Sequence, residues 1–166
     1  VLSFASTIHD RIYLLNERFD LFDIEVHGAD ALEAALASQT GALLIGAHLG
    51  SFEVLRAVGR GRAGLRVAML MYEENARKIN TTLEAINPAA SADIIPLGRM
   101  DSMLTVRDKL GQGYLVGMLA DRALGDRGEA MVDCEFLGEP APFPLGPWRL
   151  AAMLERPVFF LSLIHI

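Results

Sequence analysis

Short apolar runs alternate along the chain with longer segments that mix apolar and polar residues. The apolar runs are bounded by Gly, Pro or Asn, which is typical of buried strands, and they cover residues 42–45, 65–71, 93–97, 114–119 and 158–161. The segments between them have the spacing or the end signals of helices, over residues 31–36, 52–59, 75–87, 101–111 and 147–155. Strands separated by single helices predict an α/β fold in which helices flank a mostly parallel central sheet.

Local signals predict the ends and the inward faces of two of these helices. Asp30 is a predicted N-cap of the first helix, because a carboxylate can accept hydrogen bonds from the free amides of the first turn. Asp101 or Ser102 is predicted to cap the helix that follows the third strand. In that helix, Leu104 and Leu110 are predicted to face the core.

Residues 125–147 form the one long segment without a regular pattern. The segment is rich in Gly, Pro and acidic residues, and this composition predicts an irregular region. Long loops in folds of this kind often line active sites, so the segment is a candidate active-site loop.

Length and composition predict one globular domain over residues 1–166. Apolar residues make up 52% of the chain and charged residues 22%, which allows a substantial core. The net charge of −6 leaves no dominant basic face, so no nucleic-acid partner is expected. The single cysteine, Cys134, excludes an internal disulfide and predicts folding in a reducing compartment.

Both ends of the sequence have the features of a cut chain. It opens on Val1 without a Met and stops at Ile166 inside an apolar run, so we expect a domain truncated at both ends. Residues 161–166 resemble read-through of a sequencing adapter and form a candidate non-native tail. No stretch has the roughly 20 mostly apolar residues of a membrane span, although an anchor encoded upstream would not be visible.

The candidate chemistry lies at the end of the first predicted strand. His48 follows this strand at its carboxyl edge, where open α/β sheets tend to place ligands, and Glu53 falls in the first turn of the next helix. A carboxylate that accepts from one imidazole nitrogen fixes the tautomer, so that the other nitrogen can take a proton from a substrate hydroxyl or amine. On spacing alone an alternative stays open, in which Glu53 caps its helix through the Gly50 amide and His48 is a satisfied polar residue.

The sequence around this pair resembles that of a known family. Segment 46–53, Gly-Ala-His-Leu-Gly-Ser-Phe-Glu, is similar to the His-x4-Asp/Glu block of the lysophospholipid acyltransferase superfamily, and most closely to its lipid A biosynthesis (LpxL-like) branch. Later blocks occur in the same order: 71–77 and 97–102 resemble a bacterial subgroup of acyltransferases, and 119–122 and 143–147 resemble blocks of the lipid A enzymes. The resemblance covers about residues 8–160 and implies the α/β fold of these acyltransferases.

The chain departs from the lipid A branch at a few positions. Glu73 stands where that branch commonly carries an Arg. Ala120 replaces a proline before Asp121, and Arg122 replaces the residue that usually follows the aspartate. These departures favour a lipid acceptor that differs from a lipid A precursor.

The resemblance implies transfer of a fatty acyl group from a thioester donor, either an acyl carrier protein or acyl-CoA, to a hydroxyl of a lipid or glycolipid. The reaction would take place at a membrane surface, on the cytoplasmic face of the bacterial inner membrane. His48 would be the general base and Glu53 its support, while backbone amides near Gly50 and Ser51 would stabilise the oxyanion. No cofactor is implied, and the scattered histidines lack the spacing of metal ligands.

Three further residues are candidates for substrate binding. Arg99 and Arg122 each follow a predicted strand and are suited to bind phosphate on the donor or the acceptor, because guanidinium matches phosphate bidentately. Their alternative role is surface pairing with Asp101 or Asp126. Asp121 would orient Arg122 or a substrate hydroxyl, or alternatively cap a turn.

Two other functions stay open at this point. A non-catalytic module that binds lipid or carrier protein would keep the same fold, and a hydrolase would release the acyl group to water. Ser51 is not in a Gly-x-Ser-x-Gly elbow, so a serine esterase is disfavoured. Segment 59–64 matches Gly-x-Gly-x-x-Gly, but it precedes a strand instead of following one, so it does not predict a dinucleotide site.

Overall fold

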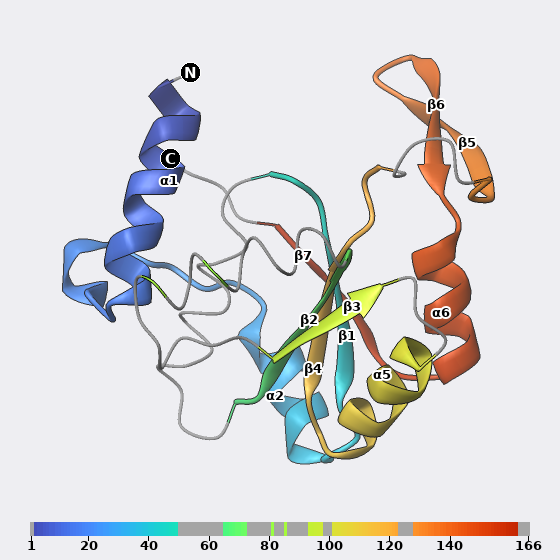
Figure 1. Ribbon diagram of the computed structural model, residues 1–166, viewed down its shortest axis with the longest axis horizontal. Helices are drawn as coiled ribbons and strands as arrows, with labels where there is room; N and C mark the ends of the chain where they lie inside the picture. The colour runs from blue at the N-terminus through green and yellow to red at the C-terminus, as the bar shows by residue number, and fades with distance from the viewer. Residues whose placement is uncertain are drawn as a thin grey trace.

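The structure is a computed structural model that describes residues 2–49, 65–72, 81, 85, 93–97, 101–122 and 128–162. The helices predicted over 52–59 and 75–87 lie outside these residues, apart from Thr81 and Ala85, which are helical. In the described part, helices alternate along the chain with the strands of a parallel sheet (Figure 1).

The central sheet has five strands in the order β3-β2-β4-β1-β7, and every neighbouring pair is parallel. The strands are β1 (Ala42–Gly46), β2 (Val67–Tyr72), β3 (Asp93–Leu97), β4 (Leu115–Leu119) and β7 (Val158–Leu161). Each corresponds to one of the apolar runs, so the predicted α/β fold with a mostly parallel sheet is confirmed.

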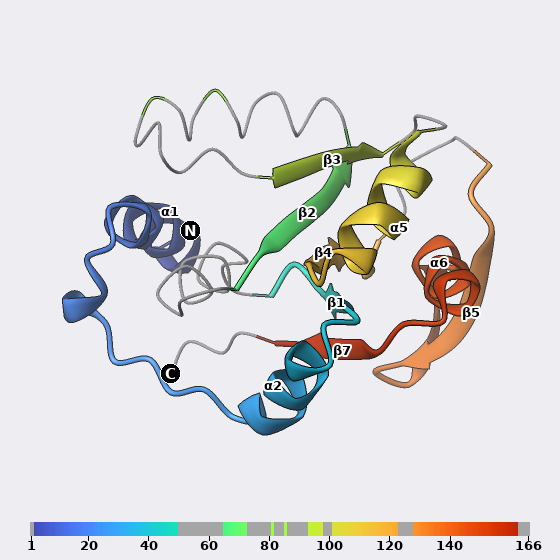
Figure 2. The ribbon, with the colours of Figure 1, turned by 90° about the horizontal axis from the view of Figure 1, so that it is seen from below.

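Helices lie on both faces of the sheet. The described helices are α1 (Leu2–Leu15), α2 (Ala29–Ala37), α5 (Ser102–Gly111) and α6 (Gly146–Leu154), with a 3-10 turn, η1, at Phe19–Leu21. In Figure 2, α5 and α6 lie on one side of the sheet and α2 lies on the other. This arrangement makes a sheet that is buried on both faces at its centre, which is why its strands read as continuous apolar runs.

The core is divided between the two faces by the alternation of side chains along each strand. Leu43 and Ile45 of β1 belong to the cluster that contains Val106 and Leu110 of α5. Their neighbours Ala42 and Leu44 belong to the opposite cluster, against which Leu32 and Leu36 of α2 pack. Strand β1 is therefore held from both sides.

Residues 125–147 are not irregular where the structure describes them, and this prediction was wrong. Strands β5 (Met131–Phe136) and β6 (Glu139–Pro144) form an antiparallel hairpin. The turn residues Leu137 and Gly138 both have positive φ, at 54° and 88°, as a two-residue hairpin turn requires. The prolines of β6 are tolerated because this two-stranded sheet leaves one edge of the strand without a partner.

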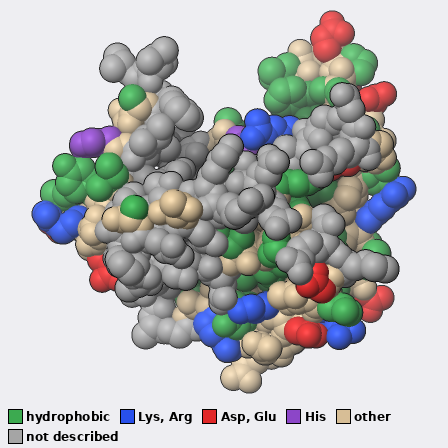
Figure 3. Space-filling model, in the orientation of Figure 1, with side chains coloured by type: hydrophobic (Ala, Val, Ile, Leu, Met, Phe, Trp, Pro, Cys, Tyr) green, Lys and Arg blue, Asp and Glu red, His purple; other side chains and the backbone are tan. Residues whose placement is uncertain are grey.

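The hairpin stands away from the sheet, on the side where the carboxyl ends of β1 and β4 lie (Figure 1). Every residue of β5 is exposed. Hydrophobic side chains gather on this projection (Figure 3), and the exposed ones include Phe136 and, at the turn, Leu137, which is 91% exposed. The segment thus presents apolar surface on the same side of the molecule as the strand ends.

The details of the helix ends differ from the predictions. Asp30 lies inside α2, whose N-cap is Gly28 with φ 72°, so the predicted cap was wrong. Asp101 is the N-cap residue of α5 but makes no capping hydrogen bond through its side chain, and the Ser102 hydroxyl donates instead to the carbonyl of Pro96. The contact with Pro96 ties the start of α5 to the end of β3.

The inward face of α5 also differs from the prediction. Ser102, Val106 and Leu110 are buried, at the four-residue spacing of one helix face. Leu104 is 54% exposed, so the prediction that it faces the core was wrong, whereas the prediction for Leu110 is confirmed. The tie between Ser102 and Pro96 fits this helix rotation, because it turns Ser102 rather than Leu104 toward the sheet.

Gly41 provides a test of the packing beneath β1. Its φ is +65°, and a Cβ at this position would lie against the Leu110 carbonyl and 2.8 Å from the Tyr114 carbonyl. Gly41→Ala is expected to lower the free energy of unfolding by an overpacking cost of about 1 to 3 kcal/mol in addition to the strain of the left-handed backbone, because both neighbours are backbone.

Gly28→Ala is the matched control, since its φ is +72° but no atom lies within 4 Å of the added Cβ. It should cost only the strain of about 1 to 2 kcal/mol. Urea denaturation measures both, and equal losses would contradict this account.

Candidate active site

The site is built by two adjacent parallel strands. β1 and β4 pair in the register Gly46↔Leu119, and the Ala120 amide donates to the Gly46 carbonyl at 2.9 Å. His48 follows the end of β1 by two residues, and Asp121 follows the end of β4 by two residues. Because parallel strands end at the same edge of a sheet, the two side chains meet although 73 residues separate them in the sequence.

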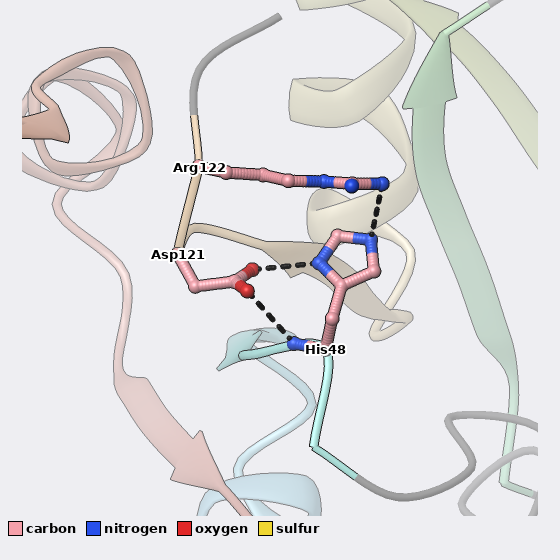
Figure 4. A network of polar contacts seen from close by, with 3 residues as sticks. All are labelled: His48, Asp121 and Arg122. Carbon is pink, nitrogen blue, oxygen red and sulfur yellow. Dashed lines mark hydrogen bonds and ion pairs between the residues drawn. The ribbon is translucent and has the colours of Figure 1, made fainter. Parts of the chain in front are cut away.

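Asp121 holds His48 through both carboxylate oxygens (Figure 4). Its Oδ1 lies 2.8 Å from His48 Nδ1, and its Oδ2 accepts from the His48 backbone amide at 3.1 Å. A carboxylate bonded to both the ring and the backbone of one residue fixes the position of that ring as well as its tautomer. Asp121 is therefore the group that orients His48 in the described part of the chain.

Arg122 contacts the other ring nitrogen. Its Nη2 lies 3.1 Å from His48 Nε2 (Figure 4). A guanidinium has donors only, so Nε2 must be the acceptor and carry no proton in this arrangement. Asp121 in turn needs a proton on Nδ1. Both neighbours therefore select the same neutral tautomer, with the proton on Nδ1 and the lone pair on Nε2.

The charge of Asp121 suits this role. Burial raises the pKa of the Asp121 carboxyl, but the hydrogen bonds from the His48 ring and the His48 amide lower it by more, and the pKa lies below its usual range. Asp121 is thus an anion at neutral pH. Its side chain is 28% exposed and that of His48 is 43% exposed, so the imidazole keeps an accessible face for a substrate.

A second polar contact joins the neighbouring strand to the hairpin. The Tyr72 hydroxyl, at the end of β2, donates to Glu129 Oε1 at 2.6 Å. Glu129 lies two residues before β5. This bond connects the hairpin to the same edge of the sheet at which His48 lies.

Of the predicted site residues, the structure brings together His48, Asp121 and Arg122. Glu53, Gly50, Ser51 and Arg99 lie outside the described residues, so their roles stay predictions. The sequence predicted that Asp121 orients Arg122 or a substrate hydroxyl, and the observed partner is His48 instead. Arg122 contacts His48, which neither the phosphate role nor the surface ion pair predicted.

One signal in the sequence could have found the pair of His48 and Asp121. Each residue stands two positions beyond the end of a largely buried apolar strand, and parallel strands bring such positions to one edge. Recognising the pair also required knowing that β1 and β4 are neighbours. The chain order alone does not give this, since β2 and β3 intervene between them.

Within residues 2–49, 65–72, 93–97, 101–122 and 128–162, no three His, Cys, Asp or Glu side chains gather as metal ligands would. None of the helices in the described part is both long enough and apolar enough to cross a membrane.

The fold and the site define an α/β protein with a carboxylate-held histidine at the carboxyl edge of a parallel sheet. A family model, described as bacterial lipid A biosynthesis acyltransferase, matches residues 9–163, and the chain belongs to this family. The resemblance drawn from segment 46–53 and the later blocks is thereby confirmed, and the protein is an acyltransferase by family. Among curated proteins none matches the chain.

Asp121→Asn tests whether the Asp121 carboxylate is ionised in the folded protein, through the pH dependence of the free energy of unfolding. Because the pKa of Asp121 is lowered in the folded state, its ionised form stabilises the fold above the pKa of an unfolded aspartate, and this contribution is lost as pH falls through the folded pKa. The difference in unfolding free energy between native protein and variant should therefore be full at neutral pH and shrink below about pH 4. Urea titrations across this range measure it.

Asp20→Asn is the matched control for this experiment. Asp20 also has a lowered pKa, because of its hydrogen bond from Arg18, but both side chains of the pair are mostly exposed, at 62% and 53%. Solvent screens such a pair, so its variant should show a smaller pH-dependent difference. A difference for Asp121 that stays constant with pH would contradict the assignment of its charge.

Proposed function

We propose that the protein transfers a fatty acyl group from a thioester donor, an acyl carrier protein or acyl-CoA, to a hydroxyl of a lipid or glycolipid. The observation that carries the proposal is the 2.8 Å contact between Asp121 and His48 Nδ1, which leaves Nε2 as the proton acceptor. This is the arrangement that a general base needs, and the family is one of acyltransferases.

In the proposed reaction, His48 Nε2 removes the proton of the acceptor hydroxyl as its oxygen attacks the thioester carbonyl. The carbonyl oxygen becomes an oxyanion in a tetrahedral intermediate. Collapse of this intermediate re-forms the carbonyl and breaks the carbon–sulfur bond, and the leaving thiolate takes the proton back from the imidazolium. Asp121 stabilises the imidazolium during these steps, because it is an anion in contact with Nδ1–H.

Glu53 has a second, supporting role in this proposal. Asp121 already occupies Nδ1, so a further carboxylate would act on His48 through its negative charge rather than through the same hydrogen bond. The amides near Gly50 and Ser51 would stabilise the oxyanion at a helix start. These assignments rest on the His-x4-Glu motif of the family and not on a described contact.

The substrates suggest roles for the arginines and a place of action. Donor thioesters and many lipid acceptors carry phosphate, and Arg99 and Arg122 would bind it through charge-assisted hydrogen bonds. No metal or other cofactor takes part in these steps. A lipid acceptor places the reaction at a membrane surface, and we propose the cytoplasmic face of the bacterial inner membrane, as the resemblance to the family implies.

The proposal predicts losses of acyl transfer in variants of His48 and Asp121. His48→Ala should lower kcat by about 10³-fold, within the range for loss of a general base. Asp121→Asn should lower kcat by about 10² to 10⁴-fold, because it removes the charge and the tautomer preference. Glu53→Gln tests whether the carboxylate of the His-x4-Glu motif contributes to kcat as the Asp121 carboxylate does. Transfer from an acyl carrier thioester to a bacterial lipid extract measures all three.

Asp108→Asn serves as the control, because this carboxylate pairs with Arg107 on α5 and not with His48. Unchanged transfer in His48→Ala would overturn the mechanism. Acyl release to water without an acceptor would favour a thioester hydrolase. Lipid binding without any acyl transfer would favour a non-catalytic module.

A further inference from the structure

Arg122 occupies the ring nitrogen that the proposed reaction needs. Its Nη2 lies 3.1 Å from His48 Nε2, at the position that an acceptor hydroxyl would have to take. The lone pair of Nε2 can accept only one such hydrogen in its plane. The arrangement in Figure 4 therefore prepares the correct tautomer of His48 and at the same time blocks its use as a base.

The proton transfer itself also opposes this contact. Once Nε2 has taken a proton, an imidazolium would face a guanidinium at hydrogen-bond distance, and two like charges with donors only would repel. Asp121 compensates one positive charge but not two. Arg122 must therefore leave Nε2 before His48 can accept a proton.

The surroundings of Arg122 allow such a movement. Its side chain is exposed, and among the described side chains no carboxylate pairs with it. The neighbouring Asp121 accepts hydrogen bonds from His48 through both of its carboxylate oxygens. Among the described side chains, the contact of the guanidinium is with this neutral ring nitrogen, which is a weaker acceptor than an anion.

A phosphate ester is such an anion. It offers two anionic oxygens to the guanidinium fork, and charge-assisted bidentate bonds are stronger than one bond to a neutral imidazole. We propose that Arg122 is a phosphate-operated gate: it covers His48 Nε2 in the empty site and withdraws when it binds the phosphate of a substrate. This proposal rests on the function proposed for His48 and adds a specificity device, since a substrate without phosphate leaves the base covered.

The gate can be tested without knowing the substrate, by the rate at which diethyl pyrocarbonate acylates His48. The reagent attacks the free lone pair of an imidazole, so a covered Nε2 reacts slowly. Peptide mass spectrometry reports the modification at each histidine. His27, whose side chain is 88% exposed, provides an internal standard for reagent activity in the same sample.

In the native protein His48 should react slowly relative to His27, and inorganic phosphate should accelerate it over chloride of equal ionic strength. Arg122→Ala should react about tenfold faster without phosphate, the factor for loss of one hydrogen bond to a charged group, and should not respond to phosphate. Arg122→Lys should keep the response, because an ammonium also donates to nitrogen and binds phosphate. Arg107→Ala, an exposed arginine paired with Asp108, should behave as the native protein does.

Two more probes distinguish the source of the phosphate. Coenzyme A tests the donor side, and a short-chain phosphatidic acid in micelles tests the acceptor side. Acceleration of His48 by either supports the gate and identifies the substrate that opens it. A rate that is insensitive to all three phosphates, or that rises equally in native protein and Arg122→Ala, would overturn the gate.

The gate and the proposed function can fail separately. If His48→Ala abolishes acyl transfer while phosphate leaves the labelling rate unchanged, only the gate is wrong. If phosphate accelerates labelling while His48→Ala transfers acyl groups normally, Arg122 responds to phosphate but His48 is not the base.

Discussion

The parallel pairing of β1 with β4 is the constraint on which the rest of the site depends. Both strands lie inside the sheet, and most of their side chains are buried. Their register brings the residues two positions beyond each strand to one edge, where His48 and Asp121 meet. The hydrophobic core thus fixes the geometry of a polar contact that would have no reason to form between two exposed loops. A shift of one residue in this register would separate the two side chains.

The three site residues constrain one another through charge and proton position. Asp121 is ionised because His48 donates to it twice, and His48 carries its proton on Nδ1 because Asp121 and Arg122 accept and donate on opposite sides of the ring. For an acyltransferase this order has a chemical meaning. In the proposed reaction the carboxylate prepares the base, and in the proposed gate the cation beside Nε2 links the use of that base to the binding of an anion.

The strands were predictable from sequence because their apolar runs are local signals, set by burial on both faces of the sheet. The hairpin β5–β6 was not, because its Gly, Pro and acidic residues are typical of loops and its strands bury almost nothing. Leu104 shows a related limit. Leu104 and Val106 are both apolar, but they lie on different faces of α5. The hydrogen bond from Ser102 to Pro96 fits the observed rotation of the helix, in which Val106 and Leu110 face the core.

By itself, the sequence determined the α/β class and the family, and it marked His48 as a candidate residue, because apolar runs and a motif within segment 46–53 are readable along the chain. It also marked Asp121 and Arg122 as residues that follow a strand. Only the tertiary structure decided that these two residues face opposite nitrogens of the His48 ring. The physical reason is strand order: β1 and β4 are neighbours in space although β2 and β3 lie between them in the sequence, and no local pattern encodes that choice.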